Sequence, residues 1–381
     1  MDTATPEAVL PASLRILSRE AFDRVLDSLE TVSDYYFATN EPIRANVQNR
    51  NRTVLPRLLD ETELRQIVYI LGDEASGLYD TIMSDPHPRD RSYTTWTTKT
   101  RYRVLIVRTA GHRQSRIRIV MRRLEKEPWE LSKLRLPEGL LDATMNDKPG
   151  LVMVLGATGS GKTSLLSGLL RAIVSNPDGD SHLVTIEDPV EYLFNDVATE
   201  RAVVSPIEIG EGCRTFEDGL RASLRMHPTH ILVGEIRDAE TAATCIAAAR
   251  SGHKVFATMH TSSISEMFSR WSDFFPESAK RRAISDLTTV VDYAVYQTLE
   301  RNEKAFGPVQ ESLDFSLFDR NKLVGHLEKN VHDIFNTVHD LVAEAGILHE
   351  EDWAILNPIK AEQQRLASQE SLSVETEAVA Q

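Results

Sequence analysis

Apolar and polar positions alternate with a period of two over parts of the first third of the chain. The clearest stretches are residues 101–108 and 116–122, and the second places its isoleucines and methionine on one face and its arginines on the other. Because successive side chains of a strand point to opposite sides of a sheet, both stretches are predicted to be strands. Helices are expected from Ser18, a capping residue followed by a helical apolar repeat, and over about 61–71.

Beyond residue 150 the pattern changes, and short apolar runs alternate with segments whose apolar residues recur every three or four positions. This alternation is typical of parallel strands joined by crossover helices, so we expect an α/β domain with a parallel sheet covered on both faces. The expected elements are strands over 151–155, 182–186, 230–233 and 254–258, and helices over 162–174, about 216–226, 239–250 and 265–274.

The remaining segments set the expected domain boundaries. Prolines and glycines interrupt residues 127–149, which predicts a linker, and the chain beyond Pro276 is expected to be mainly helical. Its helices are expected over 279–299, 321–344 and 351–356. The whole organisation is then a flexible N-terminal arm over 1–17, an N-terminal domain over 18–126, a linker over 127–149, an α/β domain with a helical extension over 150–358, and a disordered, polar tail over 359–381.

The charge and cysteine content narrow the class of protein. A net charge of −14 argues against broad binding to nucleic acid or to an anionic membrane surface. Cys213 and Cys245 have no CxxC neighbour, so neither a disulfide framework nor a zinc ribbon is expected. We find no apolar run that could span a bilayer and no secretory signal, so we expect a cytoplasmic protein in a reducing compartment, with any membrane role coming through partners.

A glycine-rich loop follows the apolar run 151–155 and opens the helix expected over 162–174. Its glycines let backbone N–H groups converge, and a helix N-terminus adds partial positive charge, which together suit the phosphates of a nucleoside triphosphate. Lys162 would reach the β- and γ-phosphates, and the Thr163 hydroxyl would complete the shell of a Mg²⁺ ion. The alternative is a chance turn before a core helix. The predicted nucleotide-binding residues are Gly156, Ala157, Thr158, Gly159, Ser160, Gly161, Lys162, Thr163 and Ser164.

Two carboxylate clusters follow expected strands, at the edge of an open α/β sheet where ligands gather. Glu187 precedes Asp-Pro, and Glu235 follows the apolar run Ile-Leu-Val-Gly. Glu235 is placed to polarise an attacking water or to bind Mg²⁺ through water, with Glu187 assisting. Helix capping or surface ion pairing is the alternative for either cluster taken alone.

His260 and a row of arginines complete the candidate site. His260 follows an expected strand and would donate to a γ-phosphate oxygen or hold Glu235, and the alternative is a structural histidine. A metal-ligand role is not expected, because no second His or Cys stands at ligand spacing. The arginines of 101–108 and 116–122 leave two interpretations open: a solvated face, or side chains that reach a phosphate held by another domain or subunit.

Four motifs follow one another in an order that is specific to one superfamily. They are the loop 156–163, the acidic box 185–191, the Walker B segment 232–238 and the histidine box 252–261. In this order they resemble the motifs of the secretion superfamily of hexameric ATPases. The chain is most similar to the PilT-like group, and within it to the DotB and TraJ ATPases of type IVB secretion and conjugative transfer systems.

This resemblance implies a PAS-like N-terminal domain joined to a RecA-like P-loop domain, assembled as a homohexamer that binds ATP and Mg²⁺. It implies that Lys162 and Thr163 bind phosphate and the metal. It also implies that Glu235 is the catalytic acid, that Glu187 is its partner, and that His260 belongs to the histidine box.

The resemblance further implies that N-domain arginines contact the nucleotide across the subunit boundary, at positions Arg103, Arg118 and Arg122. Departures from the family patterns bear on the branch. The four-cysteine zinc motif of assembly ATPases is missing, residues 316–326 replace the C-terminal signature of retraction motors, and Tyr36 stands where an N-terminal motif has histidine.

We therefore expect a cytoplasmic hexameric ATPase that powers a type IVB secretion or conjugative transfer apparatus, held at the bacterial inner membrane by protein partners. A type IV pilus retraction motor is a second hypothesis. A RecA-like nucleic-acid translocase is a third, which the acidic balance disfavours. A nucleotide-binding module without turnover is a fourth, which the two glutamates and His260 disfavour.

Overall fold

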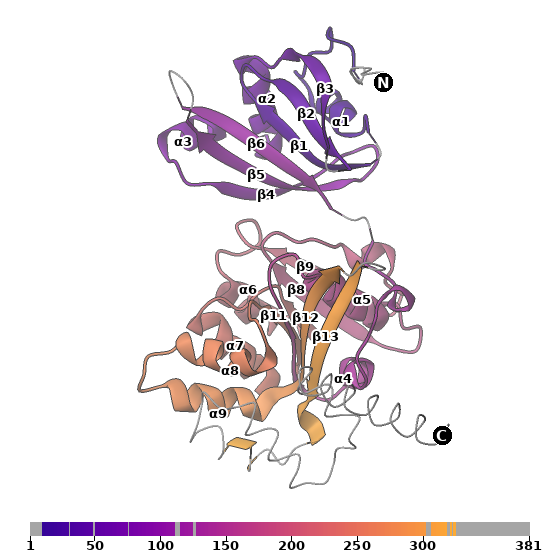
Figure 1. Cartoon of the computed structure of the whole chain (residues 1–381), viewed down its shortest axis with the longest axis vertical. Helices are drawn as coiled ribbons and strands as arrows, with labels where there is room; N and C mark the ends of the chain where they lie inside the picture. Colours follow the sequence, from indigo (N-terminus) through magenta and orange to yellow (C-terminus); the bar gives the residue numbers. More distant parts are fainter. Residues whose placement is uncertain are drawn as a thin grey trace, which may run out of the picture. The chain divides into compact units, whose positions relative to one another are not determined.

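The computed structural model describes residues 10–324 except 30, 49, 75, 111–114, 125–126, 302–305, 318–320 and 322. The chain divides into two compact units, both drawn in Figure 1. Unit 1 lies within Met1–Glu127 and also takes in Asp188–Leu193. Unit 2 lies within Pro128–Glu187 and Phe194–Gln381.

Unit 1 is built on a six-stranded antiparallel sheet whose strand order is β3-β2-β1-β6-β5-β4 (Figure 1). Buried residues of the sheet and of its helices form one hydrophobic cluster, so the helices cover a single core. The elements are α1 (Arg19–Leu26), β1 (Val32–Ala38), β2 (Pro42–Val47), β3 (Arg50–Leu58), α2 (Glu61–Leu71), α3 (Leu78–Ser84), β4 (Arg89–Thr94), β5 (Arg101–Thr109) and β6 (Arg116–Arg123).

Local signals in unit 1 predicted four of its elements, which are α1, α2, β5 and β6. Ser18 caps α1 by accepting a hydrogen bond from the Ala21 N–H, and Asp60 and Glu63 form a capping box at the start of α2. The two alternating stretches are the paired strands β5 and β6, and their apolar positions are buried as expected. These predictions are confirmed.

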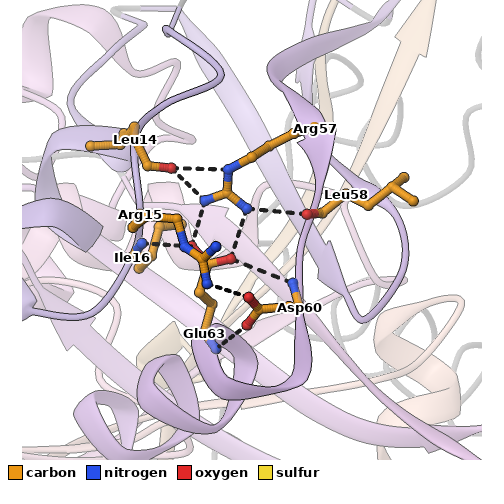
Figure 2. A network of polar contacts seen from close by, with 7 residues as sticks. All are labelled: Leu14, Arg15, Ile16, Arg57, Leu58, Asp60 and Glu63. Carbon is orange, nitrogen blue, oxygen red and sulfur yellow. Dashed lines mark hydrogen bonds and ion pairs between the residues drawn. The ribbon is translucent and has the colours of Figure 1, made fainter.

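The segment before α1 is packed against unit 1 rather than loose. The sequence predicts a flexible arm over 1–17; its first nine residues lie outside the described part, but Ile16 is fully buried. Figure 2 shows the polar network that holds this segment. The Arg57 guanidinium donates to the Leu14 carbonyl and to the Glu63 carboxylate, which also accepts a 2.7 Å bond from the Ile16 N–H. The prediction of a flexible arm is therefore wrong for residues 10–17. A local pattern could not reveal this packing, because the partners Arg57 and Glu63 lie more than 40 residues away in the sequence.

Unit 2 contains a seven-stranded sheet of order β13-β12-β7-β11-β10-β8-β9, parallel except for the antiparallel edge strand β13. In Figure 1, α4 and α5 lie on one side of the sheet, and α6, α7, α8 and α9 lie on the other. The elements are η1 (Leu131–Lys133), α4 (Leu140–Met145), β7 (Gly150–Leu155), α5 (Lys162–Val174), β8 (Ser181–Glu187), η2 (Phe194–Asp196), β9 (Ala202–Glu208), α6 (Phe216–Ser223), β10 (His230–Val233), α7 (Ala239–Arg250), β11 (Lys254–Met259), α8 (Ile264–Asp273), α9 (Lys280–Val290), β12 (Val291–Arg301), β13 (Phe306–Asp314) and η3 (Phe315–Leu317).

The four expected strands are confirmed as β7, β8, β10 and β11, and the four expected helices as α5, α6, α7 and α8. Every residue of β7, β10 and β11 is buried, as expected for strands in the middle of a sheet that is covered on both faces. The mixed α/β fold with a parallel sheet follows directly from this order.

The C-terminal part of unit 2 differs from the prediction. The helix expected over 279–299 ends at Val290 in α9, and the chain continues as strand β12 beside β7. The β-branched and aromatic residues of 290–296 fit a strand, and the partner that selects this conformation lies far away in sequence. Strands β9 and β13 were not predicted. The helices expected near 321–344 and 351–356 lie outside the described residues, apart from Asn321, Leu323 and Val324, as does the tail.

The stretch predicted as a linker is largely folded. It contains η1 and α4, and Leu140 of α4 is fully buried against unit 2. No described helix is long and apolar enough to cross a membrane. Cys213 is half-buried, Cys245 is buried, and both are free thiols.

Candidate functional site

A glycine-rich loop joins β7 to α5 at the carboxyl edge of the sheet. Gly159 and Gly161 have positive φ values of 79° and 85°, a backbone region that costs little only for glycine. Gly161 is the N-cap of α5, so the helix begins directly at Lys162. The loop crest at residues 157–159 is exposed, and Thr163 and Ser164 are half-buried in the first turn of α5.

The Lys162 ammonium is buried inside the loop. Its Nζ donates to the carbonyl oxygens of Gly156 and Ala157, both at 2.8 Å. Burial lowers the pKa of Lys162, and the nearby charge of Glu235 partly opposes this shift. A cation held by neutral carbonyls can exchange them for anionic oxygens, which stabilise it more strongly.

Glu235 follows β10 and is positioned by backbone bonds to both neighbouring strands. The Gly234 N–H donates to the Ile186 carbonyl of β8 at 2.8 Å, and the Ile236 N–H donates to the Thr258 carbonyl of β11 at 2.9 Å. Glu235 is thereby held between two strands with a partly exposed carboxylate. Its Oε2 accepts from Arg237 Nε at 2.9 Å.

His260 connects the acid to the loop lysine. It follows β11, which lies between β7 and β10 in the sheet. His260 Nε2 lies 3.2 Å from Glu235 Oε1, and His260 Nδ1 lies 3.5 Å from Lys162 Nζ. Parallel neighbours end at the same edge of a sheet, so the fold brings together three residues that are separated by 98 positions at most.

Glu187 lies at the carboxyl end of β8, next to the Glu235 segment. It is 7% exposed, and its backbone carbonyl accepts from the Ile209 N–H at 2.9 Å. A Cβ on Gly234 would stand 3.5 Å from Glu187 Cγ, an ordinary van der Waals distance, so the backbone at Gly234 packs close to this side chain. The two glutamates therefore follow neighbouring strands, as the sequence suggested.

The arginines lie in unit 1, whereas the loop, both glutamates and His260 lie in unit 2. Each expected arginine has a carboxylate close by in its own unit. The pairs are Arg103 with Asp90 at 3.4 Å, Arg118 with Glu41 at 2.8 Å and Arg122 with Asp34 at 3.1 Å. These pairs are compatible with a solvated face and leave the nucleotide-contacting role a prediction.

Two residues near the site were not singled out from the sequence. Arg237 lies within the Walker B segment, and the sequence analysis gave it no role of its own. In the structure it donates a hydrogen bond to one carboxylate oxygen of Glu235. Gln297 of β12 donates from Nε2 to the Ser160 carbonyl of the loop at 2.7 Å. The sequence analysis assigned this residue to the helix predicted over 279–299 and therefore gave it no place near the loop. The β-branched and aromatic residues of 290–296 are the signal that indicates a strand here.

The donor set suits a polyphosphate. It combines a buried ammonium, the N-terminus of a 13-residue helix and a loop whose glycines allow close approach. Among the described residues, no group of three or more His, Cys, Asp or Glu side chains could hold a metal by itself. Mg²⁺ would therefore need phosphate oxygens as ligands beside the Thr163 hydroxyl.

A buried parallel sheet, a glycine-rich loop between strand β7 and helix α5, and an acid after β10, two strands away in the same sheet, define a RecA-like P-loop domain. The chain belongs to the family described as type II/IV secretion system protein, whose model matches residues 86–316. The resemblance to PilT-like secretion ATPases close to DotB, stated from the motifs, is confirmed.

Individual relatives agree with this family. YggR of Escherichia coli K12, described as an uncharacterized protein, is 38% identical over 184 residues, which cover 48% of this chain and 55% of YggR. The chain spans about half the length of the curated relatives it matches. The structure of the Legionella pneumophila ATPase DotB is 28% identical with a TM-score of 0.74, covering 92% of this chain and 98% of DotB. The pilus retraction motor PilT with bound ADP is 26% identical with a TM-score of 0.72, covering 93% of this chain and all of PilT (100%).

Proposed function

We propose that this protein binds ATP with Mg²⁺ at the carboxyl edge of β7, β10 and β11, and hydrolyses the γ-phosphate. The observation that carries this proposal is the connected set Lys162–His260–Glu235, in which a buried cation in a phosphate-binding loop is linked to an acid. The similar PilT structure contains bound ADP, which supports the same site chemistry.

Phosphate binding and proton transfer are carried out by different residues of the site. Lys162 exchanges its two carbonyl contacts for phosphate oxygens, and the loop N–H groups hold the remaining charge. Glu235 accepts a proton from the attacking water, whose oxygen bonds to the γ-phosphorus. The bond from the γ-phosphorus to the bridging oxygen breaks, and its electron pair leaves with ADP. Thr163 and, through a water molecule, Glu235 would hold Mg²⁺, which would supply neutralising charge.

Glu187 and His260 support this step. His260 holds one oxygen of Glu235 and stands between Glu235 and Lys162, so it can report phosphate occupancy to the acid. Glu187, at the end of the neighbouring strand, assists in placing the water. Both roles rest on their positions at the same sheet edge.

The assembly we propose is a homohexamer. In each subunit, ATP hydrolysis would drive rigid-body movement of unit 1 and unit 2. Arg103, Arg118 and Arg122 of one subunit would exchange their carboxylate partners for the nucleotide of a neighbour, as arginine fingers do. The work would power a type IVB secretion or conjugative transfer apparatus. The protein would be cytoplasmic and held at the inner membrane by components of that apparatus.

The DotB similarity over 92% of the chain supports the secretion system, and the altered segment 316–326 separates this chain from the retraction signature. A pilus retraction motor is the second candidate, because the PilT structure matches nearly as well. Restored twitching in a strain that lacks its retraction motor would favour that candidate. Affinity purification from the native cell, with identification of the co-purifying membrane proteins, discriminates between the two systems.

The hydrolysis itself is tested with the full chain and two variants. Wild type is expected to release phosphate from ATP at a rate per subunit that rises with protein concentration, because the site is shared between subunits. Lys162→Ala is expected to lose ADP binding and turnover, whereas Lys133→Ala, an exposed lysine of η1, serves as the control. Full turnover in Lys162→Ala would contradict the site. A per-subunit rate independent of concentration would contradict the assembly, and strong stimulation by DNA would favour a translocase.

A further inference from the structure

Gln297 is the point at which a second strand touches the phosphate-binding loop. It lies on β12, one residue after Tyr296, which pairs with the last residue of β7, Leu155. The Gln297 side chain is therefore carried just past the end of β7 and is 4% exposed. Its Nε2 donates to the Ser160 carbonyl at 2.7 Å, and that carbonyl lies two residues before Lys162.

The loop is fitted closely around Gln297. A Cβ on Gly156 would overlap the Gln297 backbone oxygen, and a Cβ on Gly161 would stand 2.7 Å from Gln297 Nε2. Both glycines also have positive φ values, which favour glycine. At each end of the loop, glycine is therefore required both by the backbone conformation and by the closeness of Gln297. The shape of the loop is thus set by β12 as well as by its own backbone preferences.

Gln310 bonds the other end of the Gln297 amide. It faces Gln297 across the β12–β13 pair, and its Nε2 donates to Gln297 Oε1 at 2.8 Å. Because the Ser160 carbonyl can only accept, it takes the Nε2 end of the Gln297 amide, and Oε1 is left to accept from Gln310. The two glutamines form a directed chain of hydrogen bonds from the edge strand to the loop.

We infer that Gln297 is a positioning residue for the phosphate-binding loop, and that Gln310 steadies Gln297 by bonding the other end of its amide. This inference rests on the proposed ATP site and adds a control of that site by the β12–β13 pair. Gln297 touches no reacting atom in this arrangement. It acts by holding the Ser160 carbonyl, and with it the turn that presents loop N–H groups to a phosphate. Loss of the bond leaves a carbonyl without its donor and a loop with more than one shape.

The experiment compares three variants of the full chain with wild type. Gln297→Met keeps the length of the side chain and removes the donor. Gln310→Met removes only the bond to Gln297 Oε1. Glu311→Gln changes the neighbouring residue of β13, whose side chain points to the opposite face of the sheet, and serves as the control.

The readouts are the dissociation constant of a fluorescent ADP, KM and kcat for ATP, and the unfolding temperature without nucleotide. We expect Gln297→Met to weaken ADP binding and raise KM about tenfold, the effect of one lost buried hydrogen bond. We expect Gln310→Met to shift both in the same direction by less, and Glu311→Gln to leave both at wild-type values. For all three, kcat at saturating ATP should change less than KM.

Wild-type ADP affinity in a folded Gln297→Met protein would overturn the inference. If that variant does not fold, the folded Gln310→Met protein decides: weakened ADP binding supports the inference and unchanged binding overturns it. A wild-type chain that binds no ADP at all would instead overturn the proposed function, and the inference with it.

Discussion

His260 Nε2 lies 3.2 Å from Oε1 of Glu235, so the residue after β11 holds the acid after β10. The second oxygen of Glu235 accepts from Arg237, which fixes the carboxylate from both sides. The acid is therefore oriented by protein groups rather than by solvent, which lowers the cost of ordering it during reaction.

Replacing Glu235 by glutamine should separate binding from hydrolysis. The amide keeps the size of the side chain and cannot accept a proton from water, so we expect kcat to fall by about a hundredfold or more. ADP affinity should stay within a few-fold of wild type, because Lys162 and the loop are unchanged. Phosphate release and fluorescent ADP titration measure the two effects. Glu240→Gln, an exposed carboxylate of α7, is the control, and steady turnover in Glu235→Gln would remove Glu235 from its catalytic role.

Arg237→Ala should reduce turnover through the position of Glu235. Without the guanidinium, one carboxylate oxygen loses its partner at 2.9 Å and the side chain gains freedom. We expect kcat to fall about tenfold with ADP affinity unchanged. Arg221→Ala removes an exposed arginine that pairs with Glu217 on α6 and should leave kcat as it is. Equal losses in both variants would mean that the effect is not specific to the acid.

Acid should destabilise unit 2 through His230. Burial lowers the pKa of His230 to about 4, below its ordinary value of 6.5. Between these values the unfolded chain binds the proton more tightly, so stability is lost as pH falls from 6.5 towards 4. The contribution between pH 7.5 and pH 5 is about 2 kcal/mol. Urea unfolding of wild type and His230→Gln at both pH values measures it. An equal pH dependence in the two proteins would contradict the assignment.

The network in Figure 2 should stabilise unit 1. Arg57→Met leaves the fully buried Glu63 carboxylate with only the half-exposed Arg15 guanidinium, whose Nε lies 3.4 Å away, and loss of the closer partner of a buried carboxylate typically costs about 3 kcal/mol. Arg65→Met removes a guanidinium from exposed Glu61 and Asp80, and should cost less than about 1 kcal/mol. The unfolding temperatures of the two variants give the comparison. Equal shifts would show that burial of Glu63 does not decide the effect.

Local patterns predicted the strands and helices of unit 2 around the candidate site, from β7 to α8 except β9. The loop, the strands before Glu187 and Glu235, and the helices between them each carry their own signal within a few residues. The strand β12 carries a weaker signal, since its run of β-branched and aromatic residues continues a helix and becomes a strand by pairing with β7. Gln297 was missed for that reason.

Other features could not be predicted because their partners are distant in the chain. The Ile16 N–H and Glu63 are 47 residues apart, so the packing of the N-terminal segment has no local signature. The contact between Lys162 and His260 spans 98 residues and depends on strand order. The sequence placed Lys162 at the start of a helix and His260 after a strand, and only the fold gives their distance.

The two thiols differ in burial, so one of them can be labelled selectively with a fluorescent dye. Cys245 is fully buried in α7, whereas Cys213 is half-buried after β9. The pKa of the Cys213 thiol is raised, mainly by burial and to a smaller extent by the negative charge of Asp218. A maleimide dye should therefore attach to native protein at Cys213 alone, slowly at neutral pH and faster in mild alkali. Since Ile209 near that thiol bonds the Glu187 backbone, the attached fluorophore would report from beside the acidic box during turnover, without any engineered cysteine.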